Sequence, residues 1–134
     1  MEGFRSTYEH RVIFRDLDVL GHVNNAVYAT YFETGRLEYL VAVGAENLGL
    51  ILAELTISYK SPAYIRERLV IGTRVSEIKN SSFIVEGRIE EKETGRLVAT
   101  SRAAIVHFDY SENRPKPLPT EWRAKFAEFD GLSL

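Results

Sequence analysis

The amino-acid sequence predicts a small α+β protein in which one long helix is wrapped by an antiparallel β-sheet of about five strands. A strand-like alternation near the N-terminus is followed by a long helical pattern with an aromatic face. Further strand patterns then follow one another up to residue 110. Because a helix with a broad apolar face must bury it, we expect this helix to lie on the concave side of the sheet.

Size and composition are those of an ordinary globular protein. The 134 residues suffice for one domain (1–134), with 45% hydrophobic and 27% charged residues. The net charge of -2 offers no basic surface for nucleic acid, and without cysteine there is no disulfide, thiolate catalysis or cysteine-ligated zinc. No secretory signal and no stretch long enough to span a membrane is seen. We therefore expect a cytoplasmic protein with no nucleic-acid partner and no membrane partner.

The first strand is predicted over residues 8–14, because apolar and polar side chains alternate there. The side chains that share its apolar side are Tyr8, His10, Val12 and Phe14. A short polar loop follows, and it contains two aspartates, a histidine and two asparagines.

The helix is predicted over residues 25–43, which contain no proline. Asn24 is a natural N-cap and Gly44 a natural C-terminal stop. The residues whose spacing forms one face are Tyr28, Phe32, Gly35 and Tyr39, with Val27 and Tyr31 beside them.

The remaining strands are predicted over residues 50–59, 69–78, 83–91 and 96–110. In the first of these, alternation places Leu55, Ile57 and Tyr59 on one face. A hairpin turn at 92–95 uses Gly95 for a positive φ, residues 112–119 form a polar loop, and 121–129 form a short terminal helix. One sheet with one helix leaves an outer face and an edge uncovered. This arrangement favours a homodimer or homotetramer.

The chemically dense segment runs from Asp16 to Asn25, at the junction between the first strand and the helix. The N-terminus of a helix presents unpaired amides that can bind a developing oxyanion. A carboxylate beside it could attack a thioester carbonyl or activate water. The same residues could equally make turns and a helix cap, and their spacing alone does not decide between the two interpretations.

A resemblance decides between them. Residues 14–28, which read FRDLDVLGHVNNAVY, resemble the signature of the 4-hydroxybenzoyl-CoA thioesterase-like family, whose members have the hotdog fold. The Asp-x-Asp and Val-Asn-Asn-x-x-Tyr elements are also similar to those of plant acyl-acyl carrier protein (ACP) thioesterases. The motif covers about fifteen residues, and the order of strands and helix matches over nearly the whole chain. The resemblance implies a hotdog-fold acyl-CoA thioesterase that needs no metal or other cofactor.

Carried over position by position, the resemblance makes Asp18 the catalytic carboxylate, acting as nucleophile or general base. It places the amide that polarises the carbonyl at Asn25, with Asn24 beside it. His22 matches a histidine of the plant enzymes, which have an asparagine where this chain has Leu20. Their full catalytic set is therefore not present, and a mechanism centred on Asp18 is favoured. Asp16 is expected to support the loop.

Substrate contacts are expected from Lys60 and Ser61, near the path of the pantetheine arm and nucleotide, and from Tyr28 beside the acyl group. The expected substrate is an acyl-CoA thioester, hydrolysed to free acid and CoA. Two alternatives remain open: the same reaction on acyl-ACP, and an acyl-CoA-binding hotdog module without catalysis.

Overall fold

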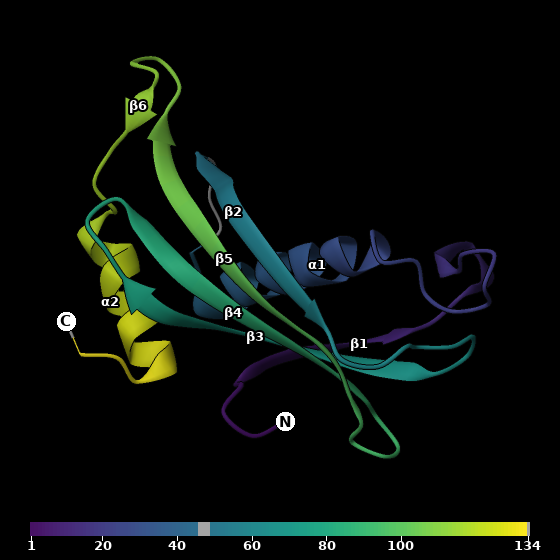
Figure 1. Ribbon diagram of the computed structural model, residues 1–134. Coiled ribbons are helices and arrows are strands. Elements are labelled where there is room, and N and C mark those ends of the chain that lie inside the picture. Colours follow the sequence, from purple (N-terminus) through teal and green to yellow (C-terminus); the bar gives the residue numbers. More distant parts are fainter. Residues whose placement is uncertain (46–48, 134) are drawn as a thin grey trace.

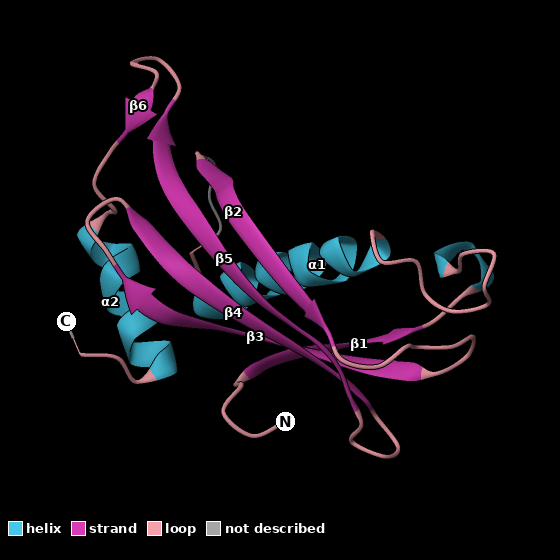
Figure 2. Cartoon of the chain, viewed as in Figure 1, coloured by secondary structure: helices cyan, strands magenta, loops and turns pink. Residues whose placement is uncertain are grey.

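The computed structural model describes residues 1–45 and 49–133. The elements of the described chain are β1 (Ser6–Arg11), the short 3-10 helix η1 (Phe14–Asp16), α1 (Val27–Val43), β2 (Leu50–Tyr59), β3 (Arg68–Ile78), β4 (Ser82–Glu91), β5 (Leu97–Asp109), β6 (Arg114–Pro115) and α2 (Thr120–Asp130). Figure 2 shows their distribution between helix and strand. The α+β class and the succession of helix and strands expected from the sequence are confirmed.

The strands form one antiparallel sheet in the order β1-β3-β4-β5-β2, and the short β6 pairs with the end of β5. Helix α1 packs against one face of this twisted sheet, where β1 and β3 are its main neighbours (Figure 1). β1 and β2 are therefore the two edges in the described chain. The face of β2 that carries Leu55, Ile57 and Tyr59 is the predicted one, because these residues pair with inward-facing positions of β5.

Helix α1 buries the predicted aromatic face, with Tyr28, Phe32 and Tyr39 each at most 4% exposed. Gly35 lets the helix approach β3, since a Cβ at this position would lie 2.6 Å from Thr73 Oγ1. Gly44 ends the helix in the left-handed conformation, with φ of 73°. The predicted C-terminal stop is thus confirmed.

The predicted first strand is wrong at both ends. β1 starts at Ser6 and stops at Arg11, two residues before the turn of η1. The chain leaves the sheet because Ile13 N–H donates to the carboxylate of Asp16 rather than to a strand (3.1 Å). Phe14, expected on the apolar side, is 84% exposed.

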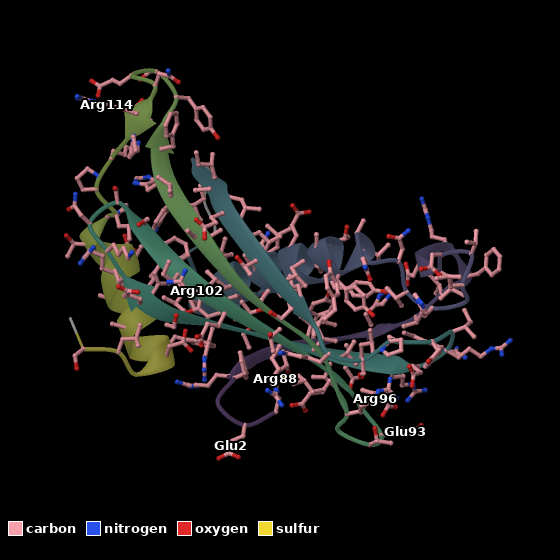
Figure 3. The ribbon with its side chains drawn as sticks, viewed as in Figure 1. Glu2, Arg88, Glu93, Arg96, Arg102 and Arg114 are labelled. Atoms are coloured by element: carbon pink, nitrogen blue, oxygen red, sulfur yellow. The ribbon has the colours of Figure 1, made fainter. Side chains whose placement is uncertain are left out.

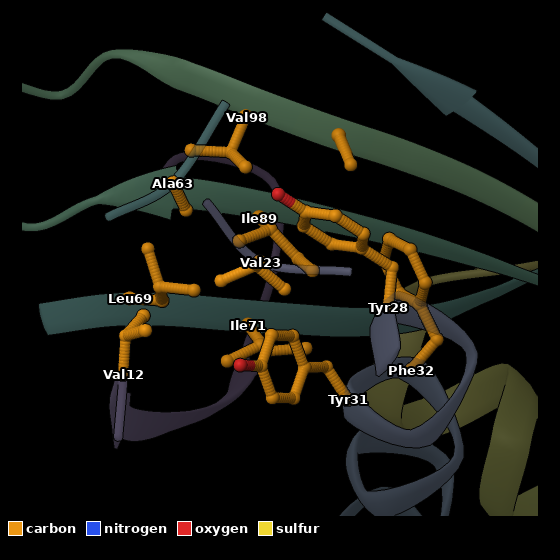
Figure 4. Close-up of a cluster of buried hydrophobic side chains, with 11 residues drawn as sticks. Val12, Val23, Tyr28, Tyr31, Phe32, Ala63, Leu69, Ile71, Ile89 and Val98 are labelled. Carbon is orange, nitrogen blue, oxygen red and sulfur yellow. The ribbon is translucent and has the colours of Figure 1, made fainter. Parts of the chain in front are cut away.

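Two clusters of buried side chains form the core. One lies between the first half of α1 and the sheet, and Figure 4 shows Tyr28, Tyr31 and Phe32 pointing from the helix into it. The other includes Tyr39, Phe83 and Phe126, and α2 closes it. The predicted terminal helix is therefore present. The polar loop expected at 112–119 contains the short strand β6, which the sequence did not indicate. In the described ranges no helix is long and apolar enough to cross a membrane.

Candidate active site

Asp18 lies in a tight turn between η1 and α1. Its main-chain carbonyl accepts from Gly21 N–H (3.2 Å), and its Oδ1 accepts from Leu20 N–H (2.8 Å). Gly21 has φ of 89°, a conformation that favours glycine, so the Asp-Val-Leu-Gly sequence folds as this turn. The Asp18 side chain is 23% exposed, which leaves its carboxylate within reach of a substrate.

His22 closes the same turn from the other side. Its Nδ1 lies 3.2 Å from Asp18 Oδ2, and its carbonyl accepts from Asp18 N–H (2.9 Å). In the tautomer with a proton on Nδ1, the imidazole donates to the carboxylate and keeps Nε2 as an acceptor. Two of the predicted catalytic residues are thus in direct contact.

The start of α1 differs in detail from the prediction. The helix begins at Val27 with Ala26 as its N-cap, two residues later than expected. Asn24 still caps the preceding turn, because its Oδ1 accepts from Ala26 N–H (2.9 Å) and its carbonyl from Val27 N–H (2.9 Å). Among the described residues nothing accepts a hydrogen bond from Asn25 N–H. An amide donor is therefore available at the positive end of a 17-residue helix.

Tyr59 was not predicted as a site residue, yet it holds the Asn25 peptide. Its hydroxyl donates to the Asn25 carbonyl (3.0 Å), and its ring packs edge-to-face on Tyr28 with centroids 5.4 Å apart. The alternation of β2 placed Tyr59 on the inner face, but nothing local in the sequence pairs it with residue 25. Both peptide groups that flank Asn25 are therefore fixed by hydrogen bonds.

Asp16 has the supporting role expected from the sequence. Its Oδ2 lies within hydrogen-bond distance of His10 Nε2 (2.8 Å), Tyr31 Oη (2.9 Å) and Ile13 N (3.1 Å). Burial alone would raise the pKa of Asp16, but these three hydrogen bonds outweigh it and hold the pKa below its ordinary value. The carboxylate fixes η1 and so the loop that carries Asp18.

Of the predicted substrate contacts, Tyr28 lies behind the site. It is 3% exposed, and the Ala63 main chain is a hydrogen-bond partner of its hydroxyl. Burial raises the pKa of Tyr28, so this phenol stays neutral. Ser61 donates to the Leu97 carbonyl (2.7 Å) and accepts from Arg96 Nε (3.2 Å), so the proton of its hydroxyl is already used in a hydrogen bond within the protein.

Lys60 is exposed and has no ion pair within the described ranges. The next residue, Ser61, contacts Arg96. Arg96 forms an ion pair with Glu67 (2.9 Å) and lies by the β4–β5 hairpin in Figure 3.

An apolar cavity of about 170 Å³ lies beside the later turns of α1. Its apolar lining includes Leu37 and Leu40 of α1, Leu50 of β2, and Phe83, Val85 and Ile105 of the sheet. No group of metal-ligating side chains is found in the part of the chain that the structure describes.

Comparison with known proteins identifies the family. The sequence profile of the thioesterase-like superfamily matches residues 12–126. The chain belongs to this superfamily. A thioesterase of Thermus thermophilus, solved in complex with coenzyme A and zinc, has a TM-score of 0.91 and 31% identity over 100% of both chains. The family and fold expected from residues 14–28 are thus confirmed.

Two curated relatives differ in the substrate that their names state. An acyl-CoA thioesterase of Haemophilus influenzae is 30% identical over 87% of this chain and 90% of its own. A chloroplastic acyl-acyl carrier protein thioesterase of Arabidopsis thaliana is 31% identical over 95% of this chain and 72% of its own.

Proposed function

We propose that this protein hydrolyses acyl-CoA thioesters to free acid and CoA, with Asp18 as the catalytic carboxylate and Asn25 N–H as the oxyanion donor. The observation that carries the proposal is the Asn25 amide just before α1, which has no acceptor within the described ranges and follows the turn that holds Asp18. A carboxylate and a fixed amide are the two groups that a thioester hydrolase without serine or cysteine chemistry requires.

In the proposed mechanism, the thioester carbonyl oxygen accepts a hydrogen bond from Asn25 N–H, which stabilises the charge that develops on it. As a nucleophile, Asp18 adds to the carbonyl carbon and expels the CoA thiolate, and water then cleaves the resulting anhydride. As a general base, Asp18 takes a proton from water while the oxygen of that water adds to the carbon. The thiolate then leaves and is protonated. His22 orients the carboxylate in either route.

The two routes differ in where the oxygen of water ends. In a single turnover in ¹⁸O-labelled water, the nucleophilic route labels the Asp18 carboxyl group and releases unlabelled acid when water attacks the Asp18 carbonyl of the anhydride. Label in Asp18 therefore identifies the nucleophilic route, whereas attack of water on the acyl carbonyl of the anhydride labels the acid. The general-base route puts the label directly into the acid.

The oxyanion donor can be tested by removing one N–H. Asn25→Pro deletes this amide at a position two residues before α1, so no hydrogen bond of the helix is lost. Proline also suits the second position of the Asn24–Val27 turn, and we expect kcat to fall about 10²- to 10³-fold. Asn25→Ala keeps the amide and is the matched control, with most of the activity retained. Equal rates for the two variants would contradict the assignment.

The protein is further proposed to act as a homodimer paired through β2, which is an edge of the described sheet. Leu52 of β2 and Leu37 and Val41 of α1 are 46%, 59% and 56% exposed, so an apolar surface lies along this edge. In an antiparallel pairing of two β2 strands, the Tyr59 end of one copy lies beside the Leu50 end of the other. The apolar cavity of one copy would then receive the acyl chain held at Asn25 of the other.

The oligomer is tested by light scattering after size-exclusion chromatography. The expected wild-type species is a dimer or a dimer of dimers, and Leu52→Arg should yield monomers with reduced turnover. A wild-type monomer that retains full activity would contradict the shared site.

A carrier-protein substrate is the second candidate, favoured by the similarity to the Arabidopsis enzyme. A higher kcat/KM on acyl-ACP than on the matching acyl-CoA would select it. Tight acyl-CoA binding without thiol release would instead indicate a binding module. The cytoplasmic location stays a prediction.

A further inference from the structure

Three arginines at one corner of the sheet have no charge partner among the residues that the structure describes. They are Arg11 at the end of β1, Arg66 in the β2–β3 loop and Arg68 at the start of β3, here called the arginine corner. All three are exposed, and within the described residues no ion pair or side-chain hydrogen bond is found for any of them. The nearby carboxylates are already committed: Glu9 binds Lys92 and Glu67 binds Arg96.

The fold brings these like charges together against their mutual repulsion. Arg11 and Arg68 are direct cross-strand neighbours in the β1–β3 ladder. Arg66 N–H donates to the Val12 carbonyl (3.0 Å), which holds the third arginine beside the end of β1. Like charges in opposite positions of an antiparallel pair destabilise a sheet, so stability does not explain the cluster.

Arg66 is also in a backbone conformation that destabilises the fold. Glu67 N–H donates to the Tyr64 carbonyl (3.1 Å) and closes a turn in which Arg66 has φ of 69°. Glycine or asparagine is the usual residue in this left-handed conformation. A charged side chain at a strained position points to a functional use of that side chain.

The arginine corner is linked to the candidate active site through the main chain. His22 forms an isolated β-bridge with Tyr64, and Val23 N–H donates to the Ala63 carbonyl (2.9 Å). Arg68 is only four residues beyond Tyr64, a span of at most roughly 14 Å. Figure 1 shows the loop after β1 and the loop before β3 at the same end of the molecule. An extended pantetheine arm covers such a distance.

We infer that the arginine corner binds the phosphate groups at the nucleotide end of coenzyme A while the thioester lies at Asp18 and Asn25. Guanidinium groups bind phosphate through paired, charge-assisted hydrogen bonds, and a cluster of three suits a ligand with several phosphates. This inference rests on the proposed thioesterase function for its substrate, but the binding of the nucleotide can be measured without turnover.

The first measurement is calorimetric titration with adenosine 3′,5′-bisphosphate. We expect Arg11→Gln, Arg66→Gln and Arg68→Gln each to weaken binding about tenfold, because each removes charge-assisted hydrogen bonds. Arg114→Gln, which removes the same charge at the far hairpin in Figure 3, should leave binding unchanged. Wild-type affinity in all three corner variants, or no binding to the wild type, would overturn the inference even if the enzyme is active.

The second measurement compares thiol release from an acyl-CoA and from the matching acyl-N-acetylcysteamine thioester, which lacks the nucleotide. The corner variants should lose at least about tenfold more kcat/KM on the acyl-CoA. Equal losses on both substrates would overturn the inference and leave the thioesterase function standing. A wild type that cleaves neither thioester would refute the proposed function, and the nucleotide titration would then decide on the arginine corner alone.

Arg66→Gly separates function from folding. Glycine relieves the left-handed strain, so the midpoint of thermal unfolding should not fall, while nucleotide affinity should fall as in Arg66→Gln. A lower midpoint with unchanged affinity would show that Arg66 serves the fold.

Discussion

Replacing Tyr59 with phenylalanine tests whether the hydroxyl on β2 positions the Asn25 peptide. The change removes the hydrogen bond from Tyr59 to the Asn25 carbonyl (3.0 Å) and keeps the ring that packs on Tyr28. A neutral hydrogen bond contributes about 0.5–1.5 kcal/mol, and 1.4 kcal/mol corresponds to about tenfold in rate. We therefore expect kcat to fall about two- to tenfold. Since Tyr59 is 48% exposed, the free energy of unfolding should fall by less than about 1 kcal/mol.

The chain offers a matched control for this variant. Tyr8 also donates to a main-chain carbonyl of the helical segment, that of Tyr31 (2.8 Å), but on the β1 side. Tyr8→Phe removes the same kind of bond and should alter unfolding while keeping kcat. The assay is steady-state thiol release with a short-chain acyl-CoA, together with urea unfolding of both variants. Wild-type kcat in Tyr59→Phe, or an equal loss in Tyr8→Phe, would refute the positioning role.

Three further predictions concern stability and are measured by urea unfolding. Asp16→Ala should cost about 3 kcal/mol, because it leaves three donors unpaired. The pKa of Asp16 is lower in the folded protein, so its contribution to the free energy of unfolding is complete above the unfolded carboxyl pKa of about 3.9 and is lost as the pH falls further. If the stability of Asp16→Ala fell equally steeply with acid, this contribution would be contradicted. Gly35→Ala should destabilise by about 1–3 kcal/mol because its Cβ would press on Thr73, whereas in an exposed helix the change would stabilise. Asp130→Ala should cost about 2 kcal/mol, since Asp130 accepts hydrogen bonds from Tyr39 and from a main-chain amide of β3. An unchanged urea midpoint would show that the Tyr39–Asp130 contact between α1 and α2 does not stabilise the fold.

Much of the fold could be predicted because periodicity reports which side chains face the core. The aromatic spacing of residues 28–39 defined the buried face of α1, and the alternation of residues 54–59 gave the faces of β2. The end of β1 could not be predicted in this way. It depends on the Asp16 carboxylate, which binds Ile13 N–H and the distant Tyr31, and no local pattern reports that contact.

The candidate site likewise contains residues that a local motif predicts and residues that only the tertiary structure brings together. Asp18, His22 and Asn25 lie within eight consecutive positions, so one sequence motif predicts all three as site residues. Tyr59 reaches Asn25 only through the placement of β2 beside the helix start. Arg11 and Arg68 become neighbours only through the register of two strands that are distant in the sequence. Contacts of this kind follow from the tertiary structure.

The catalytic role of the Asp18 carboxylate can be measured as the thiol-release rate of Asp18→Asn on a panel of acyl-CoA thioesters. Asparagine can keep the turn by accepting from Leu20 N–H, but it cannot act as the catalytic carboxylate. Asp109→Asn is the matched control, because Asp109 Oδ1 also accepts from main-chain amides of a turn, at Ser111 and Glu112. We expect kcat to fall about 10²- to 10⁴-fold in Asp18→Asn, with an unchanged circular dichroism spectrum, and full activity in Asp109→Asn. A folded Asp18→Asn enzyme that keeps most of the wild-type rate would show that Asp18 is not the catalytic carboxylate.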